Sequence, residues 1–497
     1  MLDCSPRLPA VLLLVLPLAF ATPSFAQSGL DHLDDASTTP RGLLRLRAIT
    51  VWQRYDNIFT DSGVVRLGSF LTTDSLGPSQ VPALTPIQTL VQSASGSPFK
   101  LTLGQSRLNA MVRQEIVPIA LEYGVTNRFS INVFAPIVRK RVTGLFQLDT
   151  NTFGANVGPN PFRTSANAQQ NNDLVQAQFD LAAVTLQNKL TTCNNNPAVA
   201  GCATLLPRAA QAQQLVQSSR VFAGDLAGLY GGGGIAGQAF VPIDSTAAQA
   251  AIATRVVNFN LQFKDFLATS QDFITAIPRA AGGPAGVVNF QQFLVEDAGQ
   301  DSINVQRRVG FGDVEVGFRF GVIDRPQTKR RNTGIQLTVA SSLRMPTGST
   351  QTVSEIAPLN LGDGSWAVDS RAIAELRYRR AELLAAVDVA VSVKDRDTTN
   401  ALLRNSRVTY VALQPAFHLS EAFAFHGAYT LQSTDRFGST QLVGGGFSYS
   451  TLSTYKAGSK TLPLETRFTH LEAVTGSNGL PKFFRDQIEL RIYFRLF

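Results

Sequence analysis

The chain ends in the stretch RDQIELRIYFRLF, residues 485–497 of its 497. The even-numbered residues from 488 to 496 are all apolar, whereas Glu489, Arg491 and Arg495 fall on the odd-numbered face. Strict alternation of this kind predicts a β-strand with one apolar and one charged face. Because an arginine that faces lipid near the middle of a bilayer costs about 2–4 kcal/mol, we expect the apolar face to contact acyl chains. The charges then face the interior of a closed sheet.

The same period of two recurs through the second half of the chain. It appears in FGDVEVGFRFGVI (311–323), GIQLTVASSLRM (334–345) and ELLAAVDVAVSV (382–393). Short and long connections alternate between these segments, as they do in outer-membrane barrels. We therefore predict an all-β transmembrane barrel of about twelve antiparallel strands, an even number that places both termini in the periplasm. The strands are expected near residues 43–54, 108–123, 129–142, 310–323, 334–346, 366–378, 382–393, 406–417, 422–432, 440–451, 462–472 and 483–497.

Charges on the inner face predict the strand register. A turn at 378–381 places Arg377 opposite Glu382 and Arg371 opposite Asp388. Corresponding registers pair Glu465 with Arg491, Arg467 with Glu489, and Glu315 with Arg344. Opposite charges should pair because an unpaired charge in a narrow, dry lumen is costly. These residues line a pathway or form a salt-bridged filling. The lumen-lining candidates are Glu315, Arg319, Arg344, Asp369, Arg371, Glu375, Arg377, Asp388, Glu465, Arg467, Glu489 and Arg491.

The first residues have the features of an export signal. Leu8 to Ala21 is a short apolar run preceded by Arg7, and Ser24-Phe25-Ala26 offers small residues for cleavage. We assign residues 1–26 to a signal peptide. Export to an oxidising compartment predicts a disulfide between Cys193 and Cys202. Export also argues against nucleic acid as the reason for the net charge of +8.

Residues 143–309 do not alternate and interrupt the strands. With residues 1–26 set aside, the barrel strands fall in 27–142 and 310–497, so this insert lies between the third and fourth strands. Apolar residues at helical spacing predict a mainly α-helical segment. They are Leu215, Phe222, Leu226 and Leu229, and then Ile252, Val256, Phe259, Phe263 and Phe266 after the caps Asp244 and Ser245. Topology places the insert outside the cell, as an extracellular cap or as a plug that folds inward.

Several short motifs resemble one family of outer-membrane proteins. They are LEYGVTNRFSINVFAPI (121–137), GFGDVEVGFRF (310–320), MPTGS (345–349) and LGDGSWAVD (361–369). Their order and spacing resemble the barrels of the phenol-degradation meta-pathway family. That resemblance implies passage of aromatic or other hydrophobic molecules. Phe497 resembles, in its position, the terminal aromatic that the barrel-assembly machinery recognises.

We therefore expect a porin-like barrel in the outer membrane of a Gram-negative bacterium that passively transports small hydrophobic or aromatic molecules. Its partners would be outer-membrane lipid, the assembly machinery and a small hydrophobic ligand. The alternative is a non-transporting barrel whose insert binds a partner at the cell surface. The four histidines lack metal-ligand spacing, so we expect no metal and no cofactor. A barrel enzyme would need groups such as His470 and Ser477 at the outer rim, and we expect no enzymatic activity.

Overall fold

The computed structural model describes residues 34–149, 154–300, 302–303, 305–327, 332–349, 361–362, 364–395, 407–435, 438–456, 458 and 462–495. The predicted signal peptide and Phe497 lie outside these residues. The chain divides into two compact units. The first contains the described residues of Met1–Ser69, Asn109–Leu145 and Ile303–Phe497, and the second contains those of Phe70–Leu108 and Phe146–Ser302.

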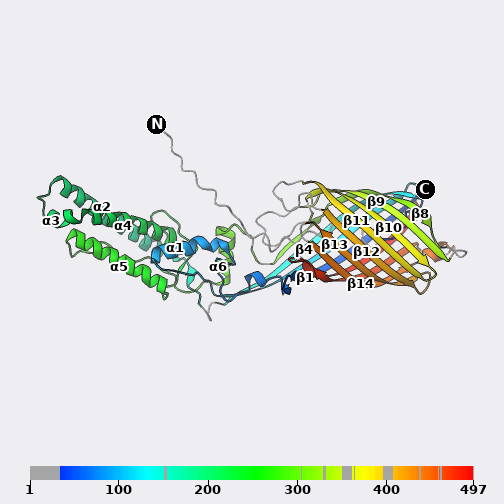
Figure 1. Ribbon diagram of the computed structural model, residues 1–497, viewed down its shortest axis with the longest axis horizontal. Helices are drawn as coiled ribbons and strands as arrows, with labels where there is room; N and C mark the ends of the chain where they lie inside the picture. Colours follow the sequence, from blue (N-terminus) through cyan, green and yellow to red (C-terminus); the bar gives the residue numbers. More distant parts are fainter. Residues whose placement is uncertain are drawn as a thin grey trace, which may run out of the picture. The chain divides into compact units, whose positions relative to one another are not determined.

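The first unit is a closed antiparallel β-barrel, and Figure 1 shows its tilted strands side by side. Within the described residues twelve strands follow one another around it, and β1 pairs with β16 from Leu43–Arg495 to Ile58–Pro481. This pairing closes the sheet, so the predicted barrel is confirmed. The strands are β1 (Leu43–Thr60), β3 (Gln105–Gly124), β4 (Phe129–Asp149), β8 (Val314–Arg325), β9 (Thr333–Met345), β10 (Ser365–Tyr378), β11 (Ala381–Asp395), β12 (Arg407–His418), β13 (Phe423–Thr434), β14 (Gly438–Ser450), β15 (Leu464–Gly476) and β16 (Pro481–Arg495).

Three smaller elements accompany the barrel strands. The short strand β2 (Gly63–Arg66) pairs with β1. The strand β7 (Gln306–Phe311) pairs with β4, as β8 does, so β7 and β8 form one interrupted strand. The helix α7 (Leu452–Lys456) follows β14. With β7 and β8 counted together, the helical insert falls between the third and fourth strands of the barrel, as predicted.

The two faces of each strand differ as the alternation predicts. In β16, Ile488 is 43% exposed and Phe494 is 42% exposed, whereas Glu489 is 1% exposed. The same parity holds in β8, where Val316 and Phe318 are exposed and Arg319 is buried. Apolar side chains on the outside and buried charges inside are the arrangement that a bilayer requires of a closed barrel.

The predicted registers are confirmed. The structure places Arg371 opposite Asp388 and Arg377 opposite Glu382. The other predicted partners are also directly opposite, with Glu465 at Arg491, Arg467 at Glu489, and Glu315 at Arg344. A shift of one residue would turn every charge on these strands outward, which explains why the charge pattern fixes the register.

Exposed aromatic residues mark both ends of the outer wall. Trp52, Trp366 and Phe484 lie toward the long-loop end of their strands, and Tyr378 and Tyr449 lie at the short-turn end. Such girdles sit at the two membrane–water interfaces of transmembrane barrels.

The second unit is mainly α-helical. Its long helices pack through a buried aromatic group in which Phe179 contacts Phe222 and Phe259 at ring-centroid distances of 5.7 and 5.9 Å. No helix of the described chain is both long and apolar enough to cross a membrane. The elements are η1 (Ser69–Leu71), η2 (Pro82–Leu84), α1 (Thr85–Ser95), β5 (Val157–Pro159), η3 (Pro161–Arg163), α2 (Ala166–Asn195), α3 (Cys202–Leu205), η4 (Leu206–Arg208), α4 (Ala209–Tyr230), β6 (Phe240–Pro242), α5 (Ala247–Leu267), α6 (Val287–Gln292) and η5 (Phe293–Asp297).

Three details of this unit differ from the sequence-based expectations. The insert is shorter at both ends than the predicted 143–309, because β4 continues to Asp149 and β7 begins at Gln306. The N-cap of α5 is Thr246, whose side chain accepts a hydrogen bond from the Gln249 amide at 3.3 Å, so the prediction of Asp244 and Ser245 as caps is wrong. Residues 70–108, expected among the barrel strands, lie in the helical unit. They do so because α1 buries Ile87 and Val91 there.

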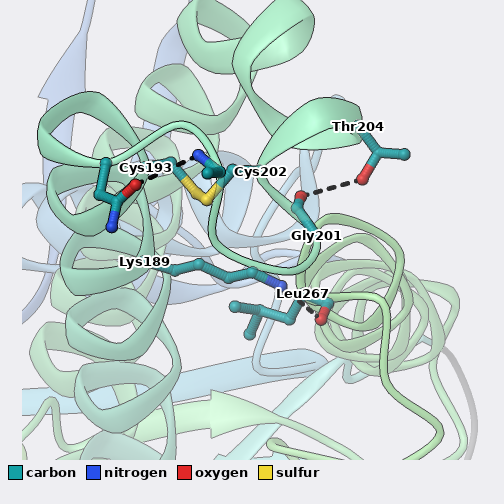
Figure 2. Close-up of a disulfide and its surroundings, with 8 residues drawn as sticks. Lys189, Cys193, Gly201, Cys202, Thr204 and Leu267 are labelled. Atoms are coloured by element: carbon teal, nitrogen blue, oxygen red, sulfur yellow. Dashed lines mark hydrogen bonds between the residues drawn. A yellow bond between two sulfur atoms is a disulfide. The ribbon is translucent and has the colours of Figure 1, made fainter.

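The structure joins Cys193 and Cys202 in a disulfide (Figure 2). Cys193 lies in the last turn of α2 and Cys202 begins α3. Beside the disulfide, the Lys189 ammonium donates a hydrogen bond to the Leu267 carbonyl at 2.9 Å. The disulfide closes the connection that leads from α2 toward α4.

Candidate functional site: the barrel lumen

The segment of residues 34–40, which precedes β1 and which we call the N-terminal segment, packs against inward-facing charges of the barrel. Asp34 is 1% exposed, and Ala36 and Thr39 are similarly buried. The Thr338 hydroxyl of β9 donates a hydrogen bond to the Ala36 carbonyl. The segment therefore occupies part of the lumen.

Asp34 forms ion pairs with three arginines from three strands. Its carboxylate lies 2.9 Å from Arg47 Nη1 of β1 and 3.0 Å from Arg491 Nη2 of β16, and it also contacts Arg319 of β8. Asp35 contacts Arg491 as well. Two neighbouring carboxylates thus connect strands from different parts of the barrel wall.

Two carboxylates of the wall complete this layer. Glu122 of β3 contacts Arg45 and accepts hydrogen bonds from the hydroxyls of Thr39 at 2.8 Å and Ser130 at 2.6 Å. Glu489 of β16 lies 2.7 Å from Arg47 Nη2 and 2.6 Å from Arg491 Nε. Hydrogen bonds of this kind satisfy the charges that burial removes from water.

The N-terminal segment balances the charge of this layer. Four buried arginines, at positions 45, 47, 319 and 491, meet four carboxylates, at positions 34, 35, 122 and 489. Two of the carboxylates belong to the segment. If the segment withdrew, the layer would hold two uncompensated positive charges, which is costly in a confined lumen. The charge balance therefore favours the inserted position.

Further along the lumen lies a second polar cluster. Glu315 Oε1 is 2.9 Å from Arg344 Nε, and Asp388 Oδ2 is 2.5 Å from Arg371 Nη2. Asp369 is buried two positions from Arg371 on β10. These pairs join adjacent strands in the register that the sequence predicts.

The remaining sequence-predicted charges are only partly buried and have other partners. Glu465 accepts a hydrogen bond from the Tyr493 hydroxyl at 2.7 Å. Glu382, which is opposite Arg377, lies 2.8 Å from His418 Nε2. Glu375, Arg377 and Arg467 are also half-buried on the inward parity.

An apolar cluster also lies inside the barrel. Its members that lie in strands are on the same inward face as the buried charges, and it also includes Ala36 of the N-terminal segment. Leu442 and Leu471 are 2% and 3% exposed. The lumen is thus divided between ion pairs and a continuous apolar surface. The cluster is formed by Ala36, Tyr55, Phe59, Leu67, Val112, Val142, Ile373, Leu384, Ala386, Ala412, Ala428, Leu442, Leu471, Ala473, Leu480 and Phe483.

Sequence reasoning missed the N-terminal half of the ion-paired layer. The missed residues are Asp34, Asp35, Arg45, Arg47 and Glu122. The alternating stretch LLRLRAI at 43–49 carries a signal for the two arginines, because both fall on one parity between apolar residues. The aspartates lie outside any strand, so periodicity gives no signal for them.

The described residues of the lumen form no metal-binding arrangement. In the described ranges no group of three His, Cys, Asp or Glu side chains could hold a metal ion. His470 points outward and its Nδ1 lies 2.7 Å from Asp486 Oδ1, while the Ser477 hydroxyl accepts a hydrogen bond from the Ser439 amide at 2.9 Å. These two side chains therefore have separate partners.

Comparison with known proteins gives distant likenesses. No family model and no curated protein matches the chain. An outer membrane channel from Pseudomonas putida F1 is 10% identical at a TM-score of 0.40, with 94% of this chain and 100% of that one covered. A mutant of the monoaromatic hydrocarbon channel TodX is 9% identical at a TM-score of 0.27, covering 93% and 92% of the two chains. The transport unit of the autotransporter AIDA-I from Escherichia coli is 5% identical at a TM-score of 0.33, covering 95% of each. At such identities and TM-scores, function has to be argued from the lumen itself.

Proposed function

We propose that the protein is an outer-membrane channel for passive passage of small hydrophobic molecules, aromatic ones included. Its exposed apolar belt and closed sheet suit a bilayer, and the predicted export signal suits the outer membrane of a Gram-negative bacterium. In this orientation both ends of the barrel chain face the periplasm, and the long loops and the helical insert face outward. Membership in the phenol-degradation meta-pathway family, which the motifs suggest, belongs to the same proposal.

The observation that carries the proposal is the apolar cluster inside the barrel. The lumen of a water-filled porin is polar. Here Leu442, Leu471 and Phe483 face inward instead. An apolar wall lowers the cost of a hydrophobic solute and offers no partners to a sugar or an ion.

The N-terminal segment is proposed to control passage. Its residue Ala36 belongs to the apolar cluster, whereas Asp34 and Asp35 hold the segment by ion pairs. A barrel of about twelve strands has a narrow interior, so a segment of this size obstructs much of it. Passage then requires the segment to shift.

A flux experiment tests the proposal. The full chain is reconstituted in vesicles with a lipopolysaccharide outer leaflet, which slows direct entry of apolar solutes, and uptake of an uncharged aromatic solute is followed. We expect Leu442→Asn to reduce the protein-dependent flux because it adds an amide to the apolar wall. The matched control is Leu145→Asn, at a leucine that is 57% exposed on β4. Equal flux in the two variants would contradict an apolar pathway.

A second candidate function is binding of a partner by the helical unit. Leu174, Leu181 and Val184 are 49%, 59% and 46% exposed, and their spacing places them on one face of α2. An exposed apolar stripe is a common feature of protein-binding helices. Replacing residues 70–104 and 150–302 of the helical unit by short linkers keeps all barrel strands and separates the two functions. A partner-binding unit predicts unchanged flux, and a plug predicts increased flux.

A further inference from the structure

Four arginines form a row on the outer wall of the barrel. Arg54 of β1, Arg113 of β3, Arg141 of β4 and Arg307 of β7 are all exposed. Arg54 is directly opposite Arg113, and Arg141 is directly opposite Arg307. The row crosses four neighbouring strands, since β3 lies beside β4.

The two halves of the row meet at the same level. Glu115 Oε2 of β3 lies 3.1 Å from Arg139 Nη1 of β4. Arg113 and Arg141 each lie two residues farther from the β3–β4 turn than Glu115 and Arg139 do. Because paired positions of antiparallel strands move together in this way, Arg113 and Arg141 lie side by side on the same face. The arginine row is therefore continuous from β1 to β7.

This arrangement lacks a counter-charge within the described part of the protein. Among those residues, no carboxylate pairs with any of the four guanidiniums, and the neighbouring Glu115 is engaged by Arg139. Like charges directly opposite each other across strands are destabilising. An external anion would remove this repulsion.

The row lies at the level of lipid headgroups. Arg54 is eleven residues along β1 from Leu43. At about 3.3 Å per residue and a tilt near 40°, it stands roughly 28 Å above the strand start, close to the ~25 Å height of the apolar band. Trp52, which is 40% exposed, lies beside the row. The exposed residues between the row and the β3–β4 turn include Ile119 and Leu121. The arginine row and the neighbouring Glu115–Arg139 pair thus mark the upper boundary of the apolar belt.

We propose that the arginine row binds the phosphate groups of the phosphorylated glycolipid of the outer leaflet. This inference rests on the outer-membrane orientation of the proposed function. Guanidinium groups bind phosphate oxygens through two parallel hydrogen bonds, and a row of four matches a lipid that carries more than one phosphate. The apolar wall beneath the row contacts the acyl chains of the same lipid. One lipid molecule can therefore satisfy both surfaces.

Binding of purified lipid A to the full chain in detergent tests this proposal. The variant Arg113→Gln/Arg141→Gln removes the centre of the row. A control with the same change in charge is Arg325→Gln/Arg380→Gln, at exposed positions of the short-turn end. Each arginine near a membrane surface contributes about fivefold to anionic-lipid binding. We therefore expect roughly 25-fold weaker binding in the row variant and near-normal binding in the control.

Three further measurements distinguish the sources of phosphate and the kinds of contact. We expect dephosphorylated lipid A to bind as weakly as the row variant does, and inorganic phosphate not to compete. The proposal is overturned if the row variant binds normally, if the control loses as much affinity, if the dephosphorylated lipid binds equally well or if inorganic phosphate displaces the lipid. Thermal unfolding verifies that the variants fold. Aromatic-solute flux should be unchanged in the row variant, so a failure of lipid binding is distinct from a failure of the channel function.

Discussion

Replacement of Asp34 by asparagine should release the N-terminal segment from the lumen. Asp34 is 1% exposed and contacts Arg47, Arg319 and Arg491. The asparagine side chain would have nearly the same shape but no charge, and it would leave the three guanidiniums short of one counter-charge. Removing one partner of a buried ion pair costs about 3–5 kcal/mol. The substitution should destabilise the inserted position by up to that amount.

This free energy predicts the size of the effect on accessibility. Because about 1.4 kcal/mol corresponds to a factor of ten, the withdrawn population should rise by roughly 10²-fold to a few times 10³-fold. Ala36 is 2% exposed in the inserted segment. A cysteine introduced by Ala36→Cys reports withdrawal through its rate of reaction with a water-soluble thiol reagent. The mature chain expected after signal cleavage has Cys193 and Cys202 in the disulfide, so the new thiol is labelled alone.

The control for this experiment is Asp61→Asn in the same Ala36→Cys background. Asp61 is exposed and accepts a hydrogen bond from the Asn478 side chain at 3.0 Å. We expect the control to label at the parental rate. Equal labelling rates for Asp34→Asn and the control would refute the idea that ion pairs hold the segment.

Three other predictions concern the barrel wall and the helical unit. Val339→Arg, on the outward face of β9, should lower the free energy of unfolding in bilayers by about 2–4 kcal/mol if its position is near the midplane, measured by urea titration of the reconstituted protein; a neutral effect would contradict lipid contact. Replacing Cys193 and Cys202 by serine opens a loop with a sequence separation of 9, and calorimetry should show a loss of about 2–3 kcal/mol by the chain-entropy model; no loss would contradict that contribution. Tyr230→Phe removes a buried hydrogen bond to Gln249 and should cost about 1–3 kcal/mol in the same assay, whereas an unchanged melting profile would argue against that bond.

Alternation and charge were sufficient to predict most of the barrel. Within each of the strands β10, β11, β15 and β16 the inward charges fall on alternate residues, so one register for each strand pair brings opposite charges together. The alternation of apolar and polar residues is weakest in β14, where glycines interrupt it. An added Cβ at Gly444 or Gly446 would lie 1.8 Å from a carbonyl oxygen of β15, so the close approach of these strands favours glycine over an alternating pattern.

The N-terminal segment could not be predicted in the same way. Its residues Asp34 and Asp35 have no periodic context, and their partners Arg319 and Arg491 are hundreds of positions away in the sequence. Such a contact depends on closure of the whole sheet. The placement of residues 70–108 in the helical unit could not be predicted either, because it depends on tertiary packing. Arg255 of α5, for example, donates hydrogen bonds to the carbonyls at the end of α1.

The most direct test of the central claim is the selectivity of the wild-type lumen. The full chain in vesicles with a lipopolysaccharide outer leaflet is compared with protein-free vesicles, using an uncharged aromatic solute and a sugar of similar size. An apolar wall beside an ion-paired segment predicts that the protein increases entry of the aromatic solute and leaves entry of the sugar almost unchanged. Equal acceleration of both solutes, or of the sugar alone, would contradict the account.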